Sequence, residues 1–161
     1  MKKYYFDKDG TSNFQMAQIS KENGININIE DVMMMDQLKN VKLKKKINLV
    51  LNLQDTGQSG SHWFSVLFRG QNVLVIDSYG CYPHMDIIQY CRNHKLKLGY
   101  SSYICQSNKS NRCGLFTLQS IKYLQNSNES NLYKHANDYV NLYGPLSLNT
   151  NEDIAIEGLV F

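Results

Sequence analysis

Two side chains suited to proton transfer, His62 and Asp77, are the first and the last residue of a predicted β-hairpin. Residues 62–68 (HWFSVLF) and 73–77 (VLVID) are rich in strand-forming residues, and residues 69–72 (RGQN) between them are typical of a turn. A carboxylate that binds one nitrogen of an imidazole fixes its tautomer and leaves the other nitrogen to take or hold a proton. The pair can do this chemistry only if the fold brings the two side chains together.

The register of the hairpin decides whether His62 and Asp77 meet. If Phe68 pairs with Val73, the two side chains become diagonal neighbours on one face of the sheet. A loop one residue longer or shorter would place them on opposite faces, because side chains alternate along a strand. On this pattern alone a second interpretation also stands, in which both are only polar residues that end their strands.

Of the cysteines, Cys113 has the position of a nucleophile. It stands directly before Gly114 and an apolar helical stripe, so the positive end of the helix dipole favours its thiolate. Gly114 would let a substrate backbone come close. Cys91 falls in an amphipathic pattern and Cys105 in a predicted strand, which indicates core thiols, and Cys81 lies in a turn.

Gln106 could complete such a site as a hydrogen-bond donor. It precedes Cys113 by seven residues and lies at the end of a predicted strand, residues 100–106. Its amide and the backbone N–H of Cys113 would together form an oxyanion hole for acyl transfer. Taken alone, a glutamine at a strand end is a common and unspecific feature.

The elements that must position these side chains include helices as well as strands. Ser12 begins a capping-box pattern, so we expect a helix over residues 12–23 that Gly24 ends. Apolar residues at alternate positions predict a half-buried strand over residues 47–53, whereas residues 29–39 stay ambiguous. Further helices are expected over residues 84–95, 114–124 and 130–143.

Composition is that of a globular protein with a single domain. The chain has 161 residues, 42% of them hydrophobic, which is enough to bury a core without disulfides. It has no apolar run that could span a bilayer and no hydrophobic N-terminal stretch, so we expect neither a membrane partner nor secretion. Within a mild net charge of +3, one lysine run is either a solvated edge or a weak, non-specific DNA contact. This run comprises Lys42, Lys44, Lys45 and Lys46.

Four motifs, taken in chain order, resemble the adenain-like cysteine proteases. They are His62-Trp63, Asp77-Ser-Tyr-Gly80, Gln106 and Cys113-Gly-Leu-Phe116. The order His, acid, Gln, Cys is that of the larger clan that includes the ubiquitin-like-protein proteases, and it is the reverse of the Cys-before-His order of papain. Each motif alone is unspecific, but four of them in this order and spacing favour a thiol protease.

Further details of the sequence are most similar to the adenovirus type within that clan. These are the loop of residues 55–61 (DTGQSGS) and the seven-residue step from the glutamine to the cysteine. Residues 12–14 and 51–53 resemble the same proteases of virophages and Polinton-like viruses. The resemblance is good over about residues 47–124, and it says nothing about residues 125–161.

The resemblance implies an α+β fold in which a central helix with the nucleophile packs on a small mixed β-sheet with the histidine and the acid. It implies that Cys113 attacks, that His62 is the general base oriented by Asp77, and that Gln106 supports the oxyanion. Trp63 would pack beside the site, although a plain core aromatic fits its position equally well. The single domain would span residues 1–161, with its core at 47–124 and a helical or irregular segment at 125–161.

The resemblance also implies a function, namely a cysteine endopeptidase that processes capsid and core precursors during virion maturation. Cleavage near small residues such as glycine, in virions or the host cytoplasm, is then expected, by a monomer without a cofactor. Adenovirus proteases use a peptide and DNA as activators, but no cysteine here clearly matches the one that tethers the peptide. The alternative from the same clan is a protease that processes or removes ubiquitin-like proteins.

Two further alternatives do not involve this chemistry. Cys81-x2-His84 and Cys91-x2-His94 have ligand types that suit zinc, although residues 85–90 between them fit a continuous helix. A non-catalytic binding protein with the same fold is a second possibility, which no residue favours.

Residues 152–161 (EDIAIEGLVF) would form a terminal strand or a segment that lies over the cleft.

Overall fold

A mixed β-sheet runs through the described part of the computed structural model, which comprises residues 11–58, 61–107, 110, 112–143 and 151. Within these residues its five strands follow one another in chain order across the sheet. The three central strands are antiparallel, and the two edge strands add in parallel. The strands are β1 (Val32–Met34), β2 (Lys46–Asn52), β3 (Trp63–Arg69), β4 (Asn72–Ile76) and β5 (Lys97–Ser101).

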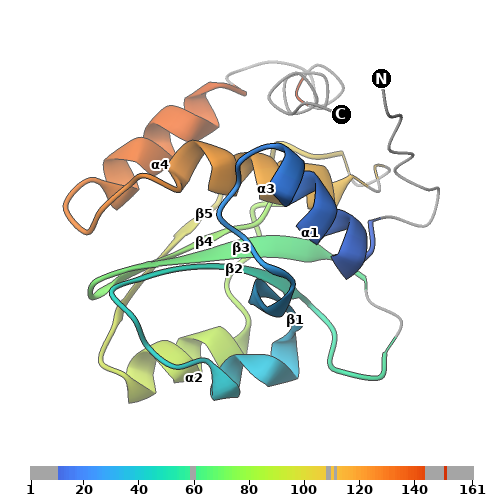
Figure 1. Cartoon of the computed structure of the whole chain (residues 1–161). Coiled ribbons are helices and arrows are strands. Elements are labelled where there is room, and N and C mark those ends of the chain that lie inside the picture. The colour runs from blue at the N-terminus through green and yellow to red at the C-terminus, as the bar shows by residue number, and fades with distance from the viewer. Residues whose placement is uncertain (1–10, 59–60, 108–109, 111, 144–150, 152–161) are drawn as a thin grey trace.

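Helices cover both faces of this sheet (Figure 1). One face carries α1 (Asn13–Glu22), α3 (Cys113–Leu124) and α4 (Leu132–Asn141), with α3 packed centrally against β3. The other face carries α2 (Met85–Asn93) and the 3-10 helix η2 (Met35–Asn40). The predicted α+β class, with a central helix on a small mixed sheet, is therefore confirmed.

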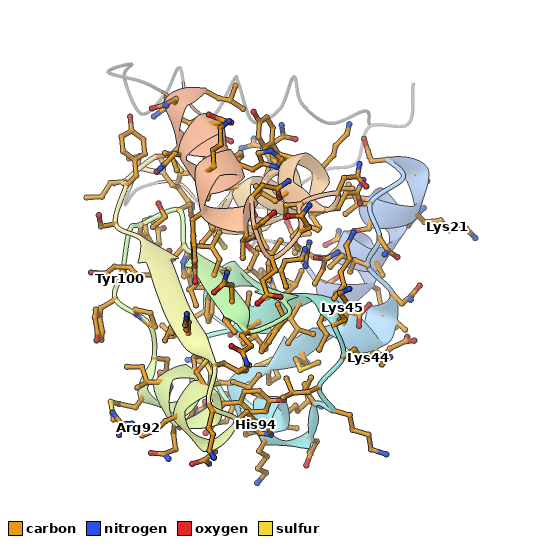
Figure 2. All side chains as sticks on the ribbon, turned by 90° about the vertical axis from the view of Figure 1, so that its left-hand side faces the viewer. Lys21, Lys44, Lys45, Arg92, His94 and Tyr100 are labelled. Carbon is orange, nitrogen blue, oxygen red and sulfur yellow. The ribbon has the colours of Figure 1, made fainter. Side chains whose placement is uncertain are left out.

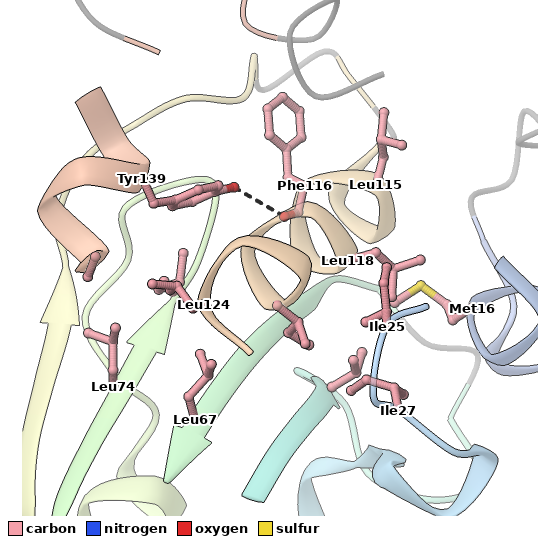
Figure 3. Packing of buried hydrophobic residues seen from close by; sticks show 14 of the residues in the cluster. Met16, Ile25, Ile27, Leu67, Leu74, Leu115, Phe116, Leu118, Leu124 and Tyr139 are labelled. Atoms are coloured by element: carbon pink, nitrogen blue, oxygen red, sulfur yellow. Dashed lines mark hydrogen bonds between the residues drawn. The ribbon is translucent and has the colours of Figure 1, made fainter. Parts of the chain in front are cut away.

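Each face of the sheet has its own hydrophobic cluster. On the α3 side, Leu67 and Leu74 meet α1, α3 and α4, and the Tyr139 hydroxyl donates to the Phe116 carbonyl at 3.3 Å (Figure 3). The α2 side holds the residues that alternate with these along the strands, such as Val66 and Val73. The prediction that β2 is half-buried is wrong, because helices on both faces bury the whole of the strand beyond its first two residues.

The predicted register of the central hairpin is confirmed. Phe68 pairs with Val73, and the ladder continues one pair further to Arg69 and Asn72. The turn is therefore only two residues long, shorter than the four-residue loop expected, but the parity of the register is the same. Gly70 in this turn has φ +57°, which a side chain with a Cβ rarely adopts.

Most other elements lie where the sequence predicts them. Ser12 caps α1 through a capping box with Gln15, and α2 and α4 fall within their predicted ranges. The ambiguous residues 29–39 form two short 3-10 helices around β1. The predicted terminal strand 152–161 lies outside the described residues. No helix among the described residues is long and apolar enough to cross a membrane.

The prediction of a strand over residues 100–106 is wrong, because β5 begins at Lys97 and ends at Ser101. The sequence hides β5 because lysine and glycine are poor strand formers, but Lys97 and Gly99 lie at an edge, where charged residues block further pairing. After Ser101 the chain leaves the ladder. The backbone N–H groups of Cys105 and Gln106 turn instead to the Ser78 carbonyl, at 2.9 and 3.1 Å.

Candidate active site

Cys113 is the first residue of α3, which begins one residue before the helix predicted from Gly114. Its side chain is buried in the site, and its Sγ accepts a hydrogen bond from the backbone N–H of Trp63 at 3.4 Å. The free N–H groups and the dipole of a twelve-residue helix begin at this thiol. A helix N-terminus with a further N–H donor at the sulfur is the kind of position in which cysteine nucleophiles are found.

His62 and Asp77 meet just beyond the paired ends of β3 and β4. His62 Nε2 hydrogen-bonds Asp77 Oδ1 at 2.7 Å, and both residues are buried. The same carboxylate oxygen accepts the backbone N–H of Tyr79 at 2.8 Å, which holds it in place. The hairpin register therefore brings together the pair that the sequence pattern allows.

The surroundings of His62 favour its cationic form. Burial lowers the pKa of the imidazole, but hydrogen bonds with the side chains of Asp77 and Cys113, and the negative charges of both groups, raise it from 6.5 to about 9. Because Nε2 is taken by Asp77, the ring nitrogen left for the thiol is Nδ1. His62 is thus hydrogen-bonded to Asp77, and the Cys113 sulfur adds to the carboxylate's effect in raising the pKa of its imidazole.

We expect Asp77→Asn to lower the pKa of His62 by about one to three pH units, because it removes the opposite charge that stabilises the imidazolium. In the wild type, the raised pKa stabilises the fold fully below pH 6.5, and this contribution is lost as the pH rises through about 9. NMR titration of the His62 ring measures both midpoints. Asp86→Asn, at an exposed carboxylate on α2, is the control. An unchanged midpoint in Asp77→Asn would contradict the coupling.

Gln106 is buried beside the acid rather than at a strand end. Its Oε1 accepts a hydrogen bond from the Ser78 hydroxyl, and its Nε2 donates to the Ser110 carbonyl at 3.1 Å. The side-chain amide has two N–H donors, and the bond to Ser110 occupies one of them. The expected contact with an oxyanion at Cys113 therefore depends on the second donor.

Several residues that shape the site were missed by the sequence analysis. The Tyr79 ring stacks on His62 with centroids 4.5 Å apart, and its hydroxyl donates to the Ser110 carbonyl at 3.2 Å. Asn52 Oδ1 accepts the backbone N–H groups of Gln54 and Ser61, at 3.0 and 3.1 Å, so it closes the loop before His62. The signals for Asn52 in the sequence are a polar residue near the end of the predicted strand and the resemblance of residues 51–53 to virophage proteases.

The N-terminal segment packs directly on α3, the helix that begins at Cys113. The indole N–H of the half-buried Trp63 donates to the Thr11 carbonyl at 2.8 Å, and its ring packs against the hydrophobic cluster on the α3 side, as a core aromatic does. A Cβ on Gly114 would lie 2.8 Å from Met16 Sδ and 3.1 Å from Thr11 Cβ. Gly114 thus allows the N-terminal segment to approach α3 closely, whereas the approach of a substrate backbone stays a prediction.

We expect Gly114→Ala to lower the free energy of unfolding by about 1–3 kcal/mol, because its methyl group overpacks the contact with Met16 and Thr11. Urea unfolding measures the loss. The cost should be smaller in a Met16→Ala background, where the nearest atom is removed. Equal stability of Gly114→Ala and the wild type would show that the two helices separate without cost.

Strand β3 and helix α3 are held together along their whole length. Cys113 and the start of β3 meet at one end, and the hydroxyls of Ser65 and Ser120 hydrogen-bond at 2.8 Å in the middle. At the other end the buried Arg69 guanidinium donates to the Leu124 and Ser127 carbonyls, at 3.2 and 2.8 Å. This framework fixes the distance between the histidine and the cysteine.

The remaining sequence-based candidates lie away from this site. Cys91 is buried in the core, while His84 caps α2 through its ring nitrogen. In the described ranges, no group of three or more His, Cys, Asp or Glu residues lies close enough together to hold a metal. The exposed lysine run (Lys42, Lys44, Lys45, Lys46) leads into β2 at the end of the hairpin opposite His62 (Figure 2).

No protein-family model matches the sequence, and no curated protein matches it. Among solved structures, the chain is similar to the ASFV pS273R protease, with 16% identity and a TM-score of 0.47 over 74% of this chain. It is also similar to a de-sumoylating protease, with 16% identity and a TM-score of 0.42 over 90% of this chain and 68% of that one. The chain spans less than half (45%) of the ASFV protease chain.

Proposed function

We propose that this protein is a cysteine endopeptidase. The observation that carries the proposal is the buried His62–Asp77 hydrogen bond at 2.7 Å, together with a thiol, Cys113, that begins a helix and contributes to the raised pKa of His62. A thiol, an imidazole and a carboxylate in this order are the groups that nucleophilic acyl transfer requires. The motif order and the spacing that resemble adenain-like proteases support the same reaction.

Each group then has a defined role. Cys113 Sγ attacks the scissile carbonyl carbon, and the oxyanion binds the backbone N–H of Cys113 and the second Nε2–H of Gln106. The imidazolium of His62 gives its proton to the leaving amine, which departs and leaves a thioester. Water, deprotonated by His62, hydrolyses the thioester, while Asp77 orients and charges the imidazole throughout.

We further propose capsid and core precursor proteins as substrates, cleaved near small residues such as glycine in the virion or host cytoplasm. The support is the sequence resemblance over residues 47–124. The lysine run before β2 would supply a weak, non-specific DNA contact, remote from the catalytic groups. The alternative substrates are ubiquitin-like precursors and conjugates.

A single assay separates these substrates. The protein is offered a peptide series with glycine before the scissile bond, and in parallel ubiquitin-like fusions, with Cys113→Ala as the blank. Cleavage of the peptides supports the maturation protease. Fast turnover of the fusions without any cleavage of the peptides would overturn it in favour of the alternative, and no cleavage of either would overturn the proposed activity.

A further inference from the structure

Gln106 is held by the residue that directly follows the candidate acid. Ser78 donates its hydroxyl to Gln106 Oε1, and its carbonyl accepts the backbone N–H groups of Cys105 and Gln106, at 2.9 and 3.1 Å. Ser78 is 5% exposed and Gln106 is 1% exposed, so water does not compete for these bonds. Ser78 therefore forms hydrogen bonds with both the side chain and the backbone of Gln106.

These contacts determine which way the Gln106 amide faces. On one side lies the Ser110 carbonyl, which can only accept, so the nitrogen must face it. The oxygen is then the atom at the Ser78 hydroxyl. Because the amide group is planar, fixing the oxygen and one N–H also fixes the direction of the second N–H.

We propose that Ser78 is a positioning residue for oxyanion binding, which acts through Gln106 and does not touch the substrate. Its hydroxyl holds the amide in one orientation and so keeps the second Nε2–H available to the oxyanion formed at Cys113. By donating to Oε1 it also polarises the amide, which strengthens the N–H groups as donors. Asp77 and Ser78 are adjacent, so one turn supports both the base and the oxyanion donor. This inference rests on the proposed function.

The test is a double-mutant cycle of Ser78→Ala and Gln106→Ala, with kcat and KM measured on a peptide that the wild type cleaves. We expect kcat to fall about tenfold in Ser78→Ala, as loss of one buried hydrogen bond predicts, and about 10²-fold in Gln106→Ala. KM stays unchanged in both. In the double variant kcat is no lower than in Gln106→Ala, because Ser78 has no other route to the reaction.

A matched control and a second measurement separate positioning from a general loss of structure. Ser20→Ala removes another buried serine hydroxyl, which donates to the Met16 carbonyl within α1 at 2.7 Å, and it should lower stability without lowering kcat. Alkylation of Cys113 by iodoacetamide forms no oxyanion, so its rate should be the same in Ser78→Ala and the wild type.

Three results would overturn the inference. They are an unchanged kcat in Ser78→Ala, an equal fall of kcat in the wild-type and Gln106→Ala backgrounds, and a slower alkylation of Cys113. Any of these, with an active wild type, removes the role of Ser78 and leaves the protease proposal intact. A wild type that cleaves nothing overturns both.

Discussion

Cys113→Ala should abolish peptide hydrolysis, with a loss of kcat of about 10⁴–10⁶-fold, while the protein stays folded. No other group in the site can form the thioester, so only uncatalysed attack by water at the bound substrate remains. The substitution removes one small side chain at the start of α3, whose sulfur accepts a long hydrogen bond from the Trp63 N–H at 3.4 Å. Single-turnover cleavage of a peptide, together with urea unfolding, measures both effects.

Cys91→Ala is the matched control for this prediction. Its thiol is also buried, but it lies in the core on the α2 side of the sheet, where burial raises its pKa to about 11. A neutral core thiol takes no part in the chemistry, so activity should be unaffected. Loss of activity in Cys91→Ala, with Cys113→Ala active, would show that the wrong cysteine has been assigned.

Arg69→Met should have the largest effect on stability, a loss of about 3–4 kcal/mol in the free energy of unfolding. Arg69 is 2% exposed, and burial lowers the pKa of its guanidinium to about 10. Its N–H groups donate to one side-chain oxygen and several backbone carbonyls, all within 3.2 Å. These acceptors are Asn48 Oδ1 and the carbonyl oxygens of Ile47, Phe68, Leu124 and Ser127.

Methionine matches the length of arginine and suits a buried site, so the loss measured by urea unfolding reports the missing donors. Arg69→Lys should recover little of the lost stability. The single ammonium group of lysine cannot reach all the acceptors that surround the planar guanidinium group. Arg92→Met is the control, since Arg92 is exposed near the end of α2 (Figure 2). A loss below about 1 kcal/mol for Arg69→Met would mean that water replaces the guanidinium at these carbonyls.

The parts of the site that the sequence predicts depend on local rules. Side chains alternate along a strand, so the turn near Gly70 and the apolar pattern together determine that His62 and Asp77 share a face. A helix begins where an apolar stripe follows a polar loop, and this places Cys113 at its N-terminus. The capping box at Ser12 is equally local, and it is also confirmed.

The parts that the sequence does not predict depend on segments that are distant in the chain. Ser78 and Gln106 are 28 residues apart, and neither lies in a helix or strand whose periodicity could relate them. Arg69 reads as a turn residue in the sequence, yet it is buried because the end of α3 supplies carbonyls that no pattern near residue 69 reveals. The sequence near Gly114 does not show that Met16 and Thr11 lie against this glycine in the folded protein.

By itself, then, the sequence determined which residue types stand at which strand and helix ends, because short-range periodicity and capping control these positions. The tertiary structure decided how those ends meet. Burial between two helical layers raises the cost of any unpaired polar group, so Gln106 turns to Ser78 and Ser110 and Arg69 turns to the end of α3. Burial by itself lowers the pKa of His62, but the tertiary structure also places its imidazole beside Asp77 and Cys113, whose hydrogen bonds and negative charges raise that pKa to about 9.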